Sequence, residues 1–305
     1  MSLELIDRSA HRKDIRKDLR SDLNRKKPVR IERKSKLVVD SRWLHEHRRD
    51  PGLVLIDTRP AKDFRAGHLE GARHFDPFPF HHTDTSERGV AEFGAQLQWI
   101  FSALGIGGHD TVVFYEDESG MRAARGAWAL EYAGHPKARM LDGVLKETQE
   151  KLTSKGDKFA ATDFTLKPRA ETLASYTHLL ERIGRHDVQI FDVRSDAEYY
   201  SERMRAKHGG AIPGAIHQDW SEAQGSNGAM KSPVELRAQY EALGLDPAAE
   251  IVPYCQGGYR AAHAYVALKV AGYPNVRNYF GSWAEWGNRD DLPREHPRRK
   301  TSVHH

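Results

Sequence analysis

The chain repeats itself from Leu37 onward, and this repeat limits the possible folds more than any other feature. Three pairs of segments match in the same order: 53–59 with 188–194, 67–72 with 210–215, and 111–116 with 250–255. In the third pair Glu116 stands where Cys255 stands. The interval is 59 residues from Asp57 to Glu116 and 63 residues from Asp192 to Cys255. The repeat therefore predicts two like-folded domains that arose by duplication.

Within each copy, short apolar strands alternate with helical stretches, which predicts an α/β fold. We expect two tandem domains, each with a mostly parallel sheet flanked by helices. A polar stretch with no helical period separates the copies and predicts a linker. The expected boundaries are a basic N-terminal extension over 1–35, a first domain over 36–147, the linker over 148–168, a second domain over 169–293 and a tail over 294–305. A substrate cleft is expected between the two domains.

One loop in the second copy has the features of a reactive site. The sequence predicts a strand over 251–254, a glycine-bearing loop that opens on Cys255, and a helix over 261–271. Gly257 and Gly258 permit positive φ angles, so that successive backbone N–H groups can point inward. The N-terminus of the following helix adds its positive dipole end. Such surroundings bring a cysteine pKa from about 8.5 to roughly 7 or below.

Cys255 is the only cysteine among the 305 residues. A disulfide within the chain, a CxxC redox site and a cysteine-based zinc cluster are therefore excluded, and no metal or cofactor is expected. A lone cysteine is usually a buried structural thiol, but here strand, glycine loop, helix and Arg260 converge on it and favour a nucleophile. Arg260 is a permanent cation able to grip an anion with its fork. A free reactive thiol indicates a reducing compartment, most simply the cytoplasm.

Charge is distributed unevenly along the chain. The formal net charge is +4, and residues 1–36 hold 13 Lys/Arg against 6 Asp/Glu, so the remaining residues are net acidic. Ile15, Leu19 and Leu23 recur every four residues and predict a short helix with one apolar edge. We interpret this extension as a solvated arm, so a nucleic-acid partner is not expected. No apolar run approaches the roughly 20 residues of a membrane span, and no membrane partner is expected.

With these residues in view, the chain resembles the tandem-domain rhodanese family of thiosulfate and 3-mercaptopyruvate sulfurtransferases. The resemblance covers about residues 37–292. The segment FRAGHLEGA at 64–72 is similar to the first-domain signature of the family, with Glu70 where proline is usual. The segment VRNYFGSWAEW at 276–286 is similar to its C-terminal signature, with Phe280 where a smaller or acidic residue is common.

The resemblance implies a fold and a chemistry. The first domain would be a non-catalytic scaffold, with Glu116 where a catalytic cysteine would stand. In the second domain Cys255 would attack a small-molecule sulfur donor, thiosulfate or 3-mercaptopyruvate, and form a persulfide that cyanide or a thiol then removes. Arg260 would complete the catalytic pair and hold the anionic part of the donor. Thiosulfate is the expected donor, because Gly257 stands where mercaptopyruvate enzymes of the family carry a serine.

Further residues are assigned around this loop. Arg203, with Arg205 and Lys207, is expected to bring positive charge to the mouth of the site. The expected substrate-binding set comprises Gln256, Gly257, Gly258, Tyr259 and Arg203. Four charged residues after the first strand of each copy are expected to form structural pairs: Asp57 with Arg59, and Asp192 with Arg194. Trp283 and Trp286 are expected in the core.

Two alternative functions stay open. Cysteine-dependent phosphatases and arsenate reductases also use an anion-binding loop closed by arginine, but those loops have five residues between cysteine and arginine. Here four residues separate Cys255 from Arg260. The second alternative is a non-catalytic rhodanese-like docking protein, and the intact cysteine loop argues against it.

Overall fold

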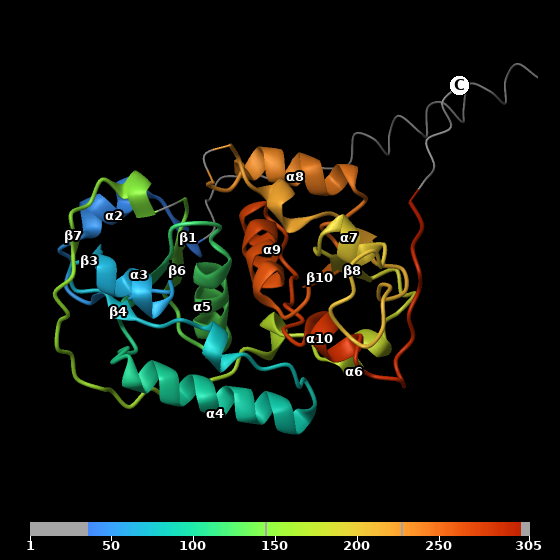
Figure 1. The fold of residues 1–305 in the computed structure, drawn as a ribbon, viewed down its shortest axis with the longest axis horizontal. Helices are drawn as coiled ribbons and strands as arrows, with labels where there is room; N and C mark the ends of the chain where they lie inside the picture. Colours follow the sequence, from blue (N-terminus) through green and yellow to red (C-terminus); the bar gives the residue numbers. More distant parts are fainter. Residues whose placement is uncertain (1–35, 144, 227, 300–305) are drawn as a thin grey trace, which may run out of the picture. The chain divides into compact units, whose positions relative to one another are not determined.

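The structure is a computed structural model that describes residues 36–143, 145–226 and 228–299 (Figure 1). The short helix expected in the N-terminal extension lies outside the described residues. The elements follow one another as β1 (Val38–Val39), α2 (Ser41–His47), β2 (Leu53–Asp57), α3 (Ala61–Ala66), β3 (His68–Leu69), β4 (Arg73–His74), η1 (Phe78–Phe80), α4 (Glu87–Ala103), β5 (Thr111–Tyr115), α5 (Met121–Tyr132), β6 (Ala138–Leu141), η2 (Leu145–Thr148), β7 (Leu152–Thr153), η3 (Ala170–Thr172), α6 (Tyr176–Leu180), β8 (Val188–Asp192), α7 (Asp196–Tyr199), β9 (Ile216–His217), η4 (Trp220–Ala223), α8 (Pro233–Ala242), β10 (Glu250–Tyr254), α9 (Tyr259–Val270) and α10 (Ser282–Trp286).

The first domain is built on a parallel sheet of five strands in the order β1-β6-β5-β2-β4. Successive residues of β2 point to opposite faces of this sheet. Leu55 belongs to the core cluster covered by α2, while Val54 and Ile56 belong to the cluster covered by α4 and α5. Because both faces are covered, the strands are continuous apolar runs, as is usual for a buried parallel sheet.

The second domain repeats this plan with a shorter sheet. Its three strands lie in the order β10-β8-β9 and all pairs are parallel. β8 and β10 pair along their whole length, from Val188 opposite Glu250 to Asp192 opposite Tyr254. Both strands therefore end at the same edge, next to Cys255. The prediction of two α/β domains with mostly parallel sheets is confirmed.

The two domains share one apolar core where α5 packs against α9 (Figure 1). Both helices are rich in alanine on their buried faces, and small side chains let helix backbones approach closely. Ala123, Ala124 and Ala127 on α5 are all buried, as are Ala261 and Ala264 on α9. This packing brings side chains of the first domain to the N-terminus of α9, where the cysteine loop ends.

Candidate active site

The cysteine loop is shaped by two glycines with different roles. Gly258 has a φ of +83° and caps the N-terminus of α9, and a Cβ there would lie 2.5 Å from the carbonyl oxygen of Phe280. Gly257 does not have a positive φ, contrary to our expectation. A glycine is needed here because a side chain would not fit. A Cβ at Gly257 would lie 2.6 Å from Cε1 of His81 in the first domain.

Cys255 lies between β10 and α9 and is held by hydrogen bonds on both its backbone and its side chain. Its side chain is buried, and its Sγ accepts a hydrogen bond from the backbone N–H of Gly258 at 3.1 Å. The backbone N–H of Cys255 donates to Oγ of Ser282 at 3.1 Å. Burial raises the pKa of Cys255, but the charge of Arg260 and the N–H groups of the loop and of Ala261 lower it by more. The pKa of Cys255 therefore falls below its usual value, as expected for this loop.

Arg260 has a partner that the sequence did not predict. Its Nη1 and Nη2 donate to the two carboxylate oxygens of Glu198 at 2.6 and 2.9 Å. Glu198 thus takes one N–H from each terminal nitrogen, while the charge of Arg260 acts on Cys255.

Glu198 comes from α7 and was not identified from the sequence. Its side chain is buried and forms a capping box with Ser195 at the start of that short helix. Burial would raise the pKa of Glu198, but the hydrogen bonds and charge of Arg260 lower it to about 2. The S-x-x-E pattern at 195–198 predicts a helix start, but nothing in it indicates a partner 62 residues away.

The other predicted substrate-binding residues are dispersed. Nε2 of Gln256 donates to the carbonyl of Arg205 at 3.0 Å, so this amide holds the preceding insertion in place. Tyr259 Oη donates to the carbonyl of Pro77 in the first domain at 2.8 Å. The side chain of Arg203 is exposed and makes no hydrogen bond or ion pair with a described residue.

Lys207 also lies elsewhere than predicted. Its Nζ is paired with the carboxylate of Asp290 at 2.5 Å, on an exposed surface. Arg205, which was predicted together with Lys207, lies 3.6 Å from Oε1 of Glu198, beside Arg260.

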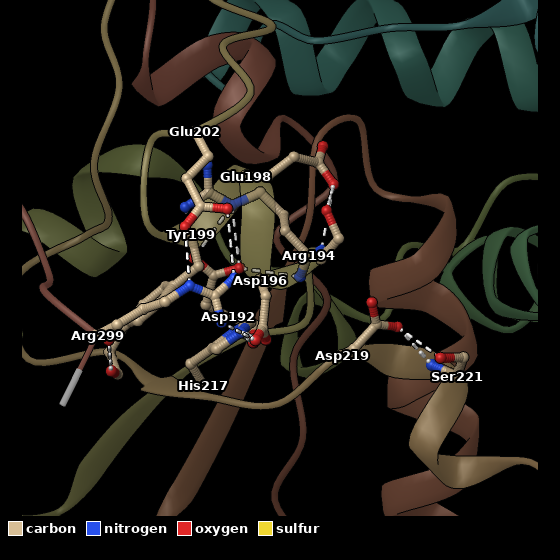
Figure 2. Close-up of polar contacts among 12 residues, drawn as sticks. Asp192, Arg194, Asp196, Glu198, Tyr199, Glu202, His217, Asp219, Ser221 and Arg299 are labelled. Atoms are coloured by element: carbon tan, nitrogen blue, oxygen red, sulfur yellow. Dashed lines mark hydrogen bonds and ion pairs between the residues drawn. The ribbon is translucent and has the colours of Figure 1, made fainter. Parts of the chain in front are cut away.

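The two Asp–Arg pairs have the structural role that the sequence predicted. Asp192 accepts a hydrogen bond from Nη2 of Arg194 at 2.6 Å (Figure 2). It accepts another from Oη of Tyr254 at 2.5 Å. Asp57 and Arg59 repeat this arrangement in the first domain, with Nη2 to Oδ2 at 2.7 Å. All four charged side chains are buried beside their sheets.

The C-terminal signature is part of the core, as expected. Trp283 and Trp286 are fully buried, and their indole N–H groups donate to the carbonyls of His208 and Pro293. The backbone N–H of Trp283 donates to the carbonyl of Cys255 at 2.9 Å. The C-terminal signature thus holds the cysteine loop in place through this backbone hydrogen bond.

A segment of the first domain, residues 76–85, lies against the cysteine loop. His81 packs over Gly257, and its ring centroid is 5.7 Å from that of Tyr259. Thr85 fixes the end of the segment, because its Oγ1 donates to Glu285 at 2.6 Å. The sequence of this segment carries no motif that predicted its position.

The first domain retains the shape of the loop without the thiol. Glu116 is buried at the position of Cys255, and its Oε1 accepts a hydrogen bond from the N–H of Arg122 at 2.7 Å. Gly120 caps α5 with a φ of +75°, matching Gly258. Burial raises the pKa of Glu116. A carboxylate there fills the place of a thiolate and offers no sulfur nucleophile.

Among the residues that the structure describes, no three His, Cys, Asp or Glu side chains are grouped so as to hold a metal ion. Within the same residues, no helix is long and apolar enough to cross a membrane.

Comparison with known proteins places both halves of the chain in one family. The model of the rhodanese-like domain matches residues 40–151 and 175–289. A thiosulfate sulfurtransferase of Azotobacter vinelandii is 34% identical over 262 residues, which is 85% of this chain and 97% of that protein. The thiosulfate sulfurtransferase of Pseudomonas aeruginosa is 32% identical over 248 residues, 80% of this chain and 92% of that protein. The sulfur carrier protein TtuD of Thermus thermophilus is 31% identical, covering 84% of this chain and 95% of its own.

Solved structures agree with the fold. An EanB variant in complex with ergothioneine superposes with a TM-score of 0.77 at 21% identity, over 88% of this chain and 72% of that chain. An anaerobic ergothioneine biosynthesis enzyme from Chlorobium limicola gives a TM-score of 0.76 at 21% identity, over 87% and 71%. These likenesses establish the architecture.

Proposed function

The chain belongs to the rhodanese family, and on that premise we propose that it is a sulfurtransferase that carries a sulfane sulfur on Cys255. The single observation that supports this most is the environment of the Cys255 thiol. It is buried at the N-terminus of α9, accepts the N–H of Gly258 and has a lowered pKa. A thiolate so placed is a nucleophile with a preorganised electrostatic site around it.

The proposed reaction has two steps. The Cys255 thiolate attacks the outer sulfur of thiosulfate, the new S–S bond forms as the bond between the two sulfurs of the donor breaks, and sulfite leaves with the electron pair. The persulfide anion is then attacked at its terminal sulfur by cyanide or a thiol, and the thiolate of Cys255 is regenerated. No external oxidant or reductant is required.

The loop geometry supports a persulfide as the intermediate. The terminal persulfide sulfur carries the negative charge, and the N–H groups of the loop together with the dipole of α9 favour an anion there. The loop has four residues between Cys255 and Arg260, fewer than a phosphate-binding loop, and the fork of Arg260 is bound to Glu198. These features favour sulfur transfer over phosphate hydrolysis.

Thiosulfate is the donor that we propose, with 3-mercaptopyruvate as the weaker substrate. Relatives named thiosulfate sulfurtransferase support this choice. Gly257 offers no hydroxyl to protonate a leaving enolate, whereas sulfite leaves without a proton. The cytoplasm is the proposed compartment, on the ground of the free thiol.

The proposal is tested by mass spectrometry and steady-state kinetics. After incubation with thiosulfate, the intact protein should gain one sulfur atom, and addition of cyanide should remove it and release thiocyanate. Cys255→Ser should show neither, while Glu116→Gln in the first domain serves as the matched control and should behave as wild type. A wild-type protein that gains no sulfur would favour the docking function. Hydrolysis of an aryl phosphate by the wild type would favour the phosphatase.

A further inference from the structure

Arg125 is a buried cation for which the described part of the chain provides no hydrogen-bond acceptor. It lies on α5 of the first domain and is 4% exposed. An arginine has five N–H donors, yet its guanidinium makes no hydrogen bond or ion pair with any described residue, and Nη1 is fully buried. Burying a charged donor without a partner is costly, so an acceptor from outside the chain is indicated.

Aromatic rings hold the guanidinium in position. Its Cζ lies 4.7 Å from the ring centroid of Trp128 and 5.3 Å from that of Phe93, both in the first domain. It lies 5.4 Å from each of the rings of Tyr259 and Phe280, in the second domain. Cation–π contacts fix the plane of the group but satisfy none of its N–H donors. Since Tyr259 follows Gly258 and Phe280 packs on it, Arg125 reaches the cysteine loop from the opposite domain.

The charges around Arg125 point to an anion at Cys255. The acidic groups that act on it are the hydroxyl of Tyr259 and the thiol of Cys255, and no described carboxylate does so. Burial lowers the pKa of Arg125 to about 10, which leaves it protonated at neutral pH. His81 also faces it, and the charge of Arg125 contributes, after burial, to lowering the pKa of His81. Of the two arginines whose charges act on the Cys255 thiol, Arg260 is paired with a carboxylate and Arg125 is not.

A small cavity accounts for part of the missing hydrogen bonding. It has a volume of about 20 Å³ and is lined by Arg125 and by Gln96, whose Oε1 is also buried without a partner. A cavity of this size has room for one water molecule, which can serve the Nη1 edge of the guanidinium. Nε and Nη2 of Arg125 make no hydrogen bond with a described residue and are not among the buried unpartnered atoms, so they remain available to an acceptor that enters the site.

We propose that Arg125 of the first domain binds the sulfonate group of thiosulfate while its outer sulfur is transferred to Cys255. This rests on the proposed function and gives the first domain a direct part in the site. Two oxygens of the sulfonate accept hydrogen bonds from the guanidinium, a geometry that arginine favours. The same contact remains with the sulfite as it leaves, so the developing charge stays compensated.

Binding in the absence of turnover tests the proposal. Cys255→Ser retains the pocket, and calorimetric titration with thiosulfate gives its Kd. Adding Arg125→Met should raise that Kd by about tenfold or more, because a charge-assisted hydrogen bond is lost. The control is Arg88→Met on α4, an exposed arginine paired with Glu92 at 2.7 Å, and it should leave the Kd unchanged. An unchanged Kd in the Arg125→Met protein would overturn the proposal.

Stability and kinetics distinguish a binding role from a structural one. A buried charge without a partner is costly in the folded protein, and an apolar side chain of similar length removes that cost. Arg125→Met should therefore melt at or above the wild-type temperature, with a raised KM for thiosulfate and a smaller change in kcat. A lowered Tm with unaltered KM would contradict the proposal. If Arg125→Met does not fold, Arg125→Lys replaces it, and an unchanged thiosulfate Kd in that protein would refute the forked contact.

A failure of the role of Arg125 can be distinguished from a failure of the proposed function. If the wild type fails to acquire sulfur from thiosulfate, the proposed function fails irrespective of Arg125. If the wild type acquires sulfur and the Arg125 variants bind and turn over thiosulfate equally well, only the role of Arg125 fails.

Discussion

At the level of single residues, the reactivity of Cys255 depends on the balance between two charges of opposite sign. Arg260 lowers the pKa of the thiol, and both of its terminal nitrogens donate to the opposite charge of Glu198. The Glu198 carboxylate holds the guanidinium of Arg260 in place, and its negative charge weakens the electrostatic effect of Arg260 on the thiol. The position of the arginine and its electrostatic effect on the thiol are therefore separate properties, and mutations can separate them.

Arg260→Ala and Glu198→Gln should shift the pKa of Cys255 in opposite directions. Loss of the cation raises the pKa, so the rate of alkylation by iodoacetamide at neutral pH should fall. Loss of the carboxylate frees the field of Arg260, so the midpoint of the alkylation profile should move to lower pH. Arg260→Ala should also lower kcat/KM for thiosulfate by about 2–4 kcal/mol in transition-state free energy. Shifts in the same direction would show that Glu198 does not oppose Arg260.

At the level of elements, the segment 76–85 of the first domain completes the surroundings of the cysteine loop. Its His81 occupies the space above Gly257 that a side chain on the loop would need. The loop is therefore adapted to a neighbour from the other domain as well as to its own backbone. Substitutions on the loop have to be judged with that neighbour present.

The variant Gly257→Ser tests the contact between the cysteine loop and His81. A serine would place a hydroxyl where mercaptopyruvate enzymes of the family carry one, but its Cβ would first meet Cε1 of His81 at 2.6 Å. We expect Gly257→Ser alone to lower kcat/KM for both donors, because His81 is displaced. In Gly257→Ser/His81→Ala the space is restored, and the ratio of kcat/KM for 3-mercaptopyruvate over thiosulfate should exceed that of the wild type. Strictly additive effects of the two changes would contradict the contact.

Local patterns in the sequence were sufficient for the elements but not for the contacts between them. The strand β10, the loop at Cys255 and the helix α9 follow from apolar runs and glycines, and the duplication gives the order of both domains. The partner of Arg260, by contrast, lies on α7, and Arg125 lies in the other domain. Glu198 belongs only to a helix-capping pattern and Arg125 to no motif, because only the packing of the helices brings them near the cysteine loop.

At the level of the whole described chain, the two domains depend on one another through the contact of α5 with α9. Tyr265 on α9 donates through Oη to Glu131 on α5 at 3.0 Å. His263, also on α9, is buried, and its ring stands at right angles to that of Trp220 with a centroid distance of 5.1 Å. Its Nδ1 has no partner among the described residues. A charge on this imidazole would therefore be unfavourable in the folded protein.

His263 should make the folded protein sensitive to acid. Burial lowers the pKa of His263 to about 4, below the 6.5 of an exposed histidine. Between these values the unfolded chain binds the proton more readily, so the free energy of unfolding falls as the pH falls from 6.5 toward 4. The full shift corresponds to about 3 kcal/mol.

In His263→Leu this contribution disappears, and the loss of unfolding free energy between about pH 7.5 and about pH 4.5 should be smaller than in the wild type by about 2–3 kcal/mol. Urea denaturation at the two pH values measures it, with the exposed His109→Leu as the control that should follow the wild type. An equal pH dependence in His263→Leu and the wild type would mean that the imidazole is hydrated or paired in the folded protein.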